Sequence, residues 1–265
     1  MKPPTKLLSL AAASLYIFLY APIVVVMIFS FNATRHGVGW HGFTTEWYRV
    51  LLHNREALDA TGNTLLLAFA STAVSTLLGT MLGYALHRYA VPGRMVISRL
   101  LHVPVFIPDV VMAAALLLFF SIVRQWLGIF ELGLRTMFFA HVTFQIPFVT
   151  LVVRSRMAGL DTTLEEAAHD LGANAWQTFR HVTLPLLLPG VLAGAMLAFT
   201  LSLDDFVVSF FTSGPGSTTL PILIYSSVKR GVTPDIHALS TLLVLASIAG
   251  TVVVTLLQGR GRKGS

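Results

Sequence analysis

Residues 164–172 read LEEAAHDLG, and after nine further residues positions 182–185 read VTLP. This stretch is a polar, helix-forming island between two long apolar segments. Thr162 followed by Glu165 matches a capping box, which predicts that a short helix begins there. Gly172 tolerates the positive φ with which many helices end. The pattern therefore predicts a short, capped, rigid helix within a loop of an otherwise apolar chain.

The residues around this helix extend the prediction. Ala167 and Ala168 make one face of it small, so another protein can approach closely. Residues 174–179 are expected to begin a second short helix, and Leu184-Pro185 to open the next apolar segment. An ordinary pair of amphipathic interfacial helices is the alternative. The fixed offset between Gly172 and the Leu-Pro pair argues against it.

The composition is that of a membrane protein. The chain has 265 residues, of which 55% are apolar and 11% charged, whereas a soluble domain carries roughly 25% charged residues. Six segments approach or exceed the ~20 residues that cross a bilayer core. They are 7–31, 63–86, 96–123, 137–153, 186–213 and 236–258. Their continuous apolar runs lack the alternation of a membrane β-barrel, so we expect an all-α polytopic membrane protein with six transmembrane helices.

The basic residues indicate an orientation. With the N-terminus inside, the inner loops hold eleven of the 18 Lys and Arg residues and the outer loops seven, which favours cytoplasmic termini by the positive-inside rule. The net charge of +6 then reflects membrane topology, and dispersed basic residues do not indicate nucleic-acid binding. The first apolar run is longer than the core of a signal peptide and is read as a retained helix.

The first outer loop, residues 32–62, is rich in aromatic side chains. We expect a short amphipathic helix lying at the membrane surface, and docking of an external partner is the alternative. Cysteine is absent and no His-x3-His pair occurs, so no metal site is expected. The glycines of residues 214–216 are not followed by the lysine of a phosphate-binding loop, so no nucleotide site is expected in this chain.

Helix packing and helix bends also leave signals in the sequence. Gly79 with Gly83, and Gly190 with Gly194, are spaced four residues apart, which predicts close helix contacts. Prolines inside or at the ends of apolar runs predict local bends. They are Pro22, Pro104, Pro108, Pro147 and Pro189.

Three aspartates, Asp109, Asp204 and Asp205, fall inside apolar segments. An aspartate near a helix centre costs roughly 2.5–3.5 kcal/mol in insertion, so these side chains are expected to face a water-filled path. On a continuous fifth helix one face carries Ser202, Asp205, Ser209 and Thr212. Asp205 is therefore the first candidate for the substrate path, then Asp204, about 100° away. Asp109 is expected ten or so residues into the third helix.

The alternative for these aspartates is pairing with a basic residue inside the bundle. No Lys or Arg lies well inside a predicted span, so such a partner is expected only from another subunit. An acidic path without internal basic residues suits a cationic substrate.

The spacing Glu166-Ala167-Ala168, three residues, Gly172, nine residues, then Val182-x-Leu-Pro resembles the cytoplasmic loop of binding-protein-dependent ABC import permeases, with Val182 in place of Ile. The resemblance implies type I ABC importer permease architecture. It implies one permease domain over 1–265, with core helices at about 63–258 and a cytoplasmic coupling loop at about 154–184. The residues implied in coupling to the ATPase are Glu166, Ala167, Ala168, Gly172, Leu184 and Pro185.

The same resemblance implies partners. A second permease subunit would complete a heterodimer, two cytoplasmic ATPase subunits would bind ATP and Mg, and an external binding protein would deliver substrate. The chain itself is then a transporter subunit, not an enzyme, and holds no cofactor. It would lie among lipids in a bacterial inner membrane with both termini cytoplasmic.

A looser combination of residues resembles the second permease of bacterial spermidine/putrescine importers. It comprises SLDD at 202–205, Pro108-Asp109, Gly214-Pro215, Leu220-Pro221, IYS at 224–226 and, in the first outer loop, GFT at 42–44 and WY at 47–48. Permeases for ferric iron, thiamine or sulfate share the coupling loop and remain alternatives. A cation-coupled secondary transporter usually shows an internal repeat with interrupted helices, which is not seen here. The usual motifs of intramembrane hydrolases are also missing.

Overall fold

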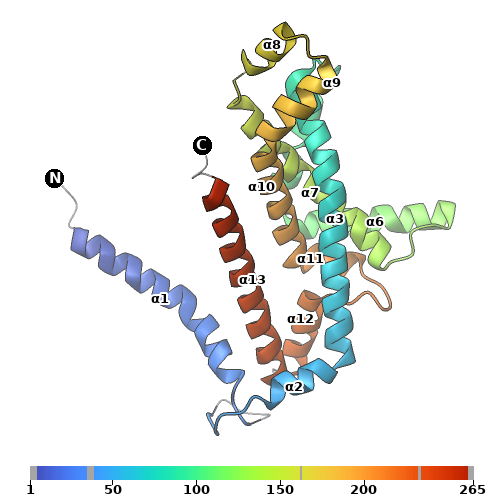
Figure 1. Ribbon diagram of the computed structural model, residues 1–265. Helices are drawn as coiled ribbons and strands as arrows, with labels where there is room; N and C mark the ends of the chain where they lie inside the picture. The colour runs from blue at the N-terminus through green and yellow to red at the C-terminus, as the bar shows by residue number, and fades with distance from the viewer. Residues whose placement is uncertain (1–4, 35–38, 162, 232–233, 262–265) are drawn as a thin grey trace. The chain divides into compact units, whose positions relative to one another are not determined.

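A computed structural model describes residues 5–34, 39–161, 163–231 and 234–261. Across these ranges the regular secondary structure is helical, with one isolated bridge between Asn32 and Phe43. The longer helices are α1 (Thr5–Phe29), α3 (Arg55–Arg88), α6 (Asp109–Leu127), α7 (Leu134–Ala158), α10 (Leu184–Leu203) and α13 (Pro234–Gly261). The shorter ones are α2 (Glu46–His53), α4 (Arg94–Leu100), α5 (Val103–Phe106), α8 (Thr163–Asp170), α9 (Ala175–Thr178), the π-helical turn η1 (Phe179–Thr183), α11 (Val207–Thr212) and α12 (Leu220–Arg230) (Figure 1).

The expected membrane helices are present. Within the described ranges, five helical stretches are long and apolar enough to cross a bilayer, and α13 occupies the sixth predicted segment. The all-α prediction is confirmed. The helices form two compact units, one within Met1–Leu58 and Leu223–Ser265 and the other within Asp59–Ile222.

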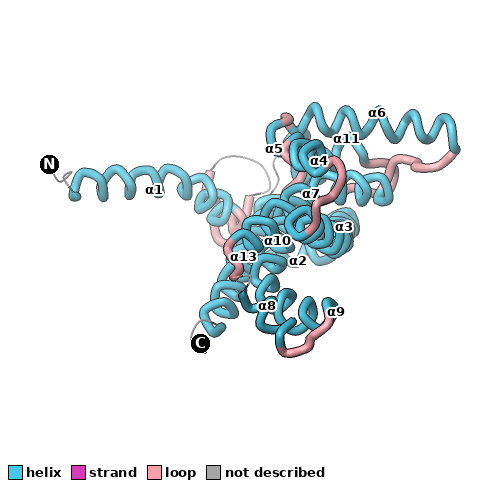
Figure 2. The backbone as a smooth tube through the Cα atoms, turned by 90° about the horizontal axis from the view of Figure 1, so that it is seen from above, coloured by secondary structure: helices cyan, strands magenta, loops and turns pink. Residues whose placement is uncertain are grey.

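In the larger unit, α3, α7 and α10 run alongside one another and α6 projects to one side of them (Figures 1 and 2). The four glycines of the two predicted pairs all meet α7. A Cβ at Gly79 would lie 2.7 Å from the Val149 Cβ, and one at Gly194 would lie 3.2 Å from a methyl of the same valine. Gly83 and Gly190 likewise approach Thr150 and Arg156. Because glycine has no side chain, α3 and α10 both approach α7 closely, and Gly79 and Gly194 meet the same valine of α7.

These contacts predict a difference between two glycines of α3. Gly79→Ala is expected to destabilise the folded protein by about 1–3 kcal/mol, since its methyl group overlaps α7. Gly62→Ala is the matched control, because no atom lies within 4 Å of a Cβ there and alanine favours a helix over glycine by about 1 kcal/mol. Thermal unfolding in detergent should show a lower midpoint for the first variant only. Equal midpoints would contradict the packing described here.

Two proline-containing segments differ from the expectation of continuous helices. In the third apolar segment, α5 ends at Phe106 and Ile107 is extended with ψ 133°, because a residue that precedes proline avoids the helical region. Helix α6 then starts after Pro108. The prediction of one continuous third helix is wrong, and Asp109 is the first residue of α6 instead of lying ten residues inside a helix. Pro22, Pro147 and Pro189 stay inside α1, α7 and α10.

The fifth apolar segment is also interrupted. Helix α10 ends at Leu203 and α11 begins at Val207, so the prediction of a continuous polar stripe through both is wrong. The carboxylate of Asp205 accepts the backbone N–H groups of Val208 at 3.3 Å and Ser209 at 2.7 Å. Aspartate caps a new helix in this way in preference to continuing the old one.

At its other end this segment begins earlier than expected. Helix α9 continues through η1 into α10, and the N–H of Leu184 donates to the carbonyl of Phe179. Pro185 has no N–H and its ring conflicts with a carbonyl one turn back, which accounts for a wider turn just before it. The predicted second short helix is therefore present but is joined to the fifth span.

In the smaller unit, the loop that was predicted to be the first outer loop folds back on the end of α1. The indole N–H of Trp47 donates to the carbonyl of Asn32 at 2.7 Å, and the hydroxyls of Tyr48 and Ser30 lie 2.7 Å apart. Helix α2 confirms the predicted short helix and buries Leu51. Its place at a membrane surface stays a prediction.

Candidate functional site

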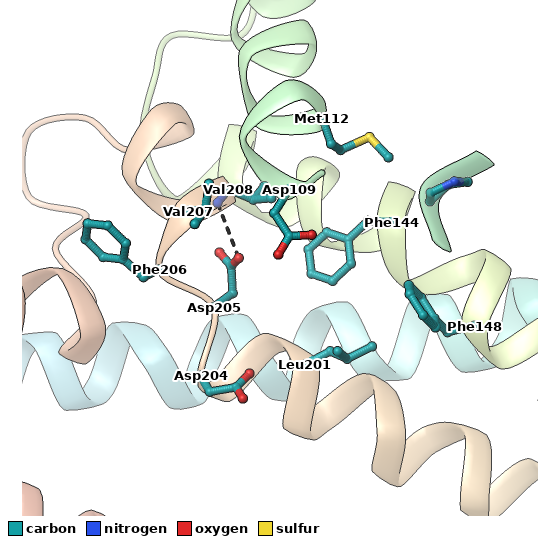
Figure 3. Close-up of a pocket in the computed structure, with 11 residues that line it drawn as sticks. Asp109, Met112, Phe144, Phe148, Leu201, Asp204, Asp205, Phe206, Val207 and Val208 are labelled. Carbon is teal, nitrogen blue, oxygen red and sulfur yellow. Dashed lines mark hydrogen bonds between the residues drawn. The ribbon is translucent and has the colours of Figure 1, made fainter. Parts of the chain in front are cut away.

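A cavity of about 340 Å³ lies where α6 and α11 begin and α10 ends (Figure 3). All three predicted path residues, Asp109, Asp204 and Asp205, line it. They come from two segments nearly one hundred residues apart in the sequence. The breaks before α6 and after α10 bring them together, because each break places an aspartate beside an unwound backbone.

The three carboxylates differ in their surroundings. Asp205 is largely buried, with 12% of its side chain exposed, and is held by the α11 backbone and by His141. Asp204 is the exposed C-cap residue of α10. Asp109 is exposed in the first turn of α6 and has no ion pair with any residue that the structure describes. Asp204 and Asp109 are thus exposed, whereas Asp205 lines the cavity from a buried position in which the protein orients its carboxylate.

His141 on α7 is the buried partner of Asp205. Its Nε2 lies 3.4 Å from Asp205 Oδ2 and 3.0 Å from Ser209 Oγ, and its Nδ1 lies 2.7 Å from Ser202 Oγ. Pairing with a basic group inside the bundle was expected only from another subunit. A histidine of the chain itself provides it, because the α10–α11 break turns Asp205 toward α7.

Gln145, one turn further along α7, extends these contacts to α3. Its amide group donates to Ser71 Oγ at 3.2 Å and to the Ala198 carbonyl at 3.1 Å, and its Oε1 accepts from Ser75 Oγ at 2.8 Å. The hydroxyls of Ser71 and Ser202 lie 3.3 Å apart. These polar groups form one buried network that joins α3, α7, α10 and α11 behind the cavity.

His141 and Gln145 are not among the functional residues predicted from the sequence. A signal was present: two strongly polar residues one helical turn apart in an apolar segment rarely face lipid. Both are fully buried. Their place behind the aspartates depends on helix packing, which residue spacing in one segment does not reveal.

The remaining wall of the cavity is apolar and aromatic. Phe144 and Phe148 of α7 face it from one side, with Met112 and Phe206 on others (Figure 3). Aromatic faces attract cations, and alkyl groups gain from leaving water. A cavity lined by both carboxylates and aromatic rings suits a cation that carries an apolar chain.

The predicted coupling helix is α8, at the end of α3 in Figure 1. Thr162, the expected N-cap, lies outside the described residues. The carboxylate of Asp161 accepts the N–H of Thr163 at 3.0 Å, and this hydrogen bond holds the pKa of Asp161 below its usual value. The side chain of Glu165 contacts Arg88 and Thr183, and the predicted capping box stays a prediction because Thr162 belongs to it.

The end of α8 follows the prediction. Gly172 has φ +84°. Its N–H donates to the carbonyl of His169 at 2.9 Å, and the N–H of Ala173 donates to that of Ala168 at 3.0 Å. These two bonds define a Schellman motif, in which glycine supplies the left-handed residue. The predicted conformation of Gly172 is confirmed.

One side of α8 and its connection to α9 exposes apolar groups. Leu171 is 90% exposed and Trp176 65% exposed, and Glu166 and Ala167 are exposed beside them. Exposed apolar side chains that lie together are typical of a surface that binds another protein. Leu184 and Pro185 do not belong to that surface, since they follow η1 at the start of α10. Their part in coupling, like that of the other predicted residues, stays a prediction.

No metal centre was expected. Across the described part of the chain, no group of three or more His, Asp or Glu side chains is arranged to hold a metal ion.

Comparisons with known proteins identify the family of the chain. The family model described as binding-protein-dependent transport system inner membrane component matches residues 75–260. The chain is 42% identical over 252 residues to the spermidine/putrescine transport system permease protein PotC of Escherichia coli (strain K12), covering 95% of this chain and 94% of PotC. It is 40% identical over 231 residues to the putrescine transport system permease protein PotI of the same strain, covering 86% and 82%.

Among solved structures, a chain of a bacterial alginate ABC transporter in complex with a periplasmic protein matches with a TM-score of 0.73 and 20% identity. The match covers 95% of this chain and 91% of that one, and it shows that the two share a fold.

Proposed function

The chain belongs to the family of binding-protein-dependent transport system inner membrane components, and we propose that it is one permease subunit of an ATP-driven ABC importer of polyamines. The cavity is the observation that carries the substrate class. Asp109, Asp204 and Asp205 line it together with aromatic side chains. A polyamine has ammonium groups separated by methylene chains, and these match the acidic and the apolar parts of the lining. The names of PotC and PotI support the same class.

The proposed assembly rests on the family to which the chain belongs. A second, different permease subunit would face this one across the membrane. Two cytoplasmic ATPase subunits would bind ATP and Mg and would receive α8 at its exposed side. An external binding protein would deliver the polyamine. The protein lies in a bacterial inner membrane, with α8 and both termini on the cytoplasmic side, as the distribution of Lys and Arg favours.

The substrate is tested by uptake in reconstituted vesicles. The chain is purified with its second permease, its ATPase and its loaded binding protein, and labelled putrescine and spermidine are supplied outside. We expect uptake of at least one polyamine that depends on ATP inside, and none of labelled sulfate or thiamine. Uptake of sulfate or thiamine without polyamine uptake would overturn the assignment.

The proposed separation of the permease from the ATPase subunits gives a second expected result. The purified chain alone should not hydrolyse ATP, since its sequence has no phosphate-binding loop. The assembled complex should, and its rate should rise when the loaded binding protein docks. Phosphate release measured on both preparations decides this, with a Walker-lysine variant of the ATPase as the control. Hydrolysis that persists in that control complex would contradict a separate ATPase.

A further inference from the structure

The side chain of Glu165 points back from α8 toward the membrane helices. Its Oε2 lies 2.9 Å from Nη2 of Arg88, in the last turn of α3. Its Oε1 accepts a hydrogen bond of 2.7 Å from the hydroxyl of Thr183, the last residue of η1. The Glu165 side chain is only 14% exposed. One carboxylate therefore connects three elements, and each of its oxygens has a different partner.

A second contact joins the same elements. The rings of Tyr84 on α3 and Phe179 on η1 meet edge to face at 5.2 Å, and Trp176 of α9 stacks on Phe179 at 5.9 Å. Tyr84 and Arg88 are four residues apart, so they occupy the same face of α3. The segment from α8 to η1 is thus attached to the end of α3 by an ion pair and by aromatic packing.

Helix α3 extends from this attachment to the buried network. It is one unbroken helix over Arg55–Arg88, and Arg88 lies about 20 Å along it from Ser75 at 1.5 Å per residue. Ser75 and Ser71 contact Gln145, and Ser71 contacts Ser202. A rigid helix passes a displacement at one end to the other, so α3 connects α8 mechanically to the wall behind Asp205.

From these contacts we propose that Glu165 is a positioning residue for energy coupling, which transmits the movement of α8 to α3 through Arg88 and to α10 through Thr183. The proposal rests on the importer function proposed above. It assigns different tasks to two neighbouring glutamates. Glu166 is exposed to solvent on α8, where an ATPase can reach it. Glu165 faces inward and holds α8 to the helices that must move.

The test compares variants in the full reconstituted complex. Glu165→Gln keeps an acceptor for Thr183 but removes the charge, and Arg88→Gln removes the other half of the ion pair. Each is expected to raise the ATP hydrolysed per polyamine imported by about fivefold, in the range by which single residues modulate coupling between sites. Each should also speed hydrogen exchange of the α8 amides. The double variant should resemble either single one.

Charge reversal separates transmission from simple loss of structure. Glu165→Arg and Arg88→Glu should each uncouple the complex, and their combination should recover at least half of the wild-type ratio. Arg94→Gln is the matched control, because Arg94 is exposed at the start of α4 without an ion pair among the described residues, and it should leave the ratio unchanged. The proposal would be overturned if the doubly reversed variant showed the sum of the two single defects. It would also be overturned if the α8 amides exchanged faster while the ATP hydrolysed per polyamine imported stayed normal.

The two measurements, ATP hydrolysed per polyamine imported and hydrogen exchange of α8, also distinguish the role of Glu165 from the proposed importer function. Hydrogen exchange of α8 needs no transported substrate and tests the ion pair directly. If the wild-type complex imports no polyamine, the proposed function fails on that result alone. If the wild-type complex imports polyamine and the variants match it in both readouts, only the role of Glu165 fails.

Discussion

Replacing Asp205 with asparagine is expected to lower polyamine uptake by about tenfold to a hundredfold, the loss of 1.4–2.8 kcal/mol of attraction to an ammonium group. Attraction between unit charges at 4 Å is about 4 kcal/mol at an effective dielectric near 20, and desolvation offsets part of it. Asparagine is also a good N-cap, so its amide oxygen can still accept from the α11 backbone. Uptake in reconstituted vesicles, with the amount of assembled complex measured in parallel, gives the result.

Two further variants and a control complete that experiment. Asp204→Asn and Asp109→Asn should lower uptake less, because these exposed carboxylates act in better-solvated surroundings. Asp59→Asn is the control, since Asp59 is exposed on α3 and does not line the cavity. Unchanged uptake in all three cavity variants would remove the acidic path as the basis for a polyamine substrate, and the family assignment would stand.

Replacing Gly172 with valine is expected to uncouple ATP hydrolysis from uptake. At φ +84°, with no atom within 4 Å of a Cβ, the substitution meets no steric neighbour and acts through the backbone alone. A β-branched residue in the left-handed region costs about 1–3 kcal/mol. In a short exposed helix this strain is expected to break the hydrogen bonds of the Schellman motif. Uptake should fall about tenfold while ATP hydrolysis is largely retained. This estimate takes a strain of about 1.4 kcal/mol, which corresponds to a factor of ten.

Gly172→Asn is the matched control, because asparagine visits the left-handed region readily. It should stay close to wild type in uptake and in ATP hydrolysed per substrate. Both variants should reach the membrane and assemble in normal amounts. Wild-type transport by Gly172→Val would mean that the geometry at the end of α8 has no part in coupling.

The buried network makes the cavity dependent on the packing around α7. His141 and Gln145 make hydrogen bonds to side chains of three other helices, and an unsatisfied polar group in such a place costs about 1–3 kcal/mol. The glycines that face α7 allow the close approach on which these bonds depend. Cavity geometry and helix packing are thus parts of one arrangement.

The sequence by itself determined the class of fold and the presence of the short helix α8. Continuous apolar runs of membrane length have one solution with all backbone groups paired, which is the helix. Local rules placed the end of α8 at Gly172 and the start of α10 at Leu184-Pro185, because capping and proline geometry depend on adjacent residues. The glycine pairs also indicated close packing, but not that both would face α7.

Only the tertiary structure decided how the polar residues of different helices meet. A helical projection placed Asp205 on a continuous stripe, whereas the cap it forms on α11 breaks that helix and turns the carboxylate toward His141. A capping side chain stabilises the start of a helix by only about 1 kcal/mol. Packing of α11 against α6 and α7 therefore determines whether the chain caps a new helix or continues the old one. The contacts of Asp205 with His141 and of Glu165 with Arg88 join residues more than sixty positions apart in the sequence. No local pattern encodes such pairs, because they exist only once the helices have packed.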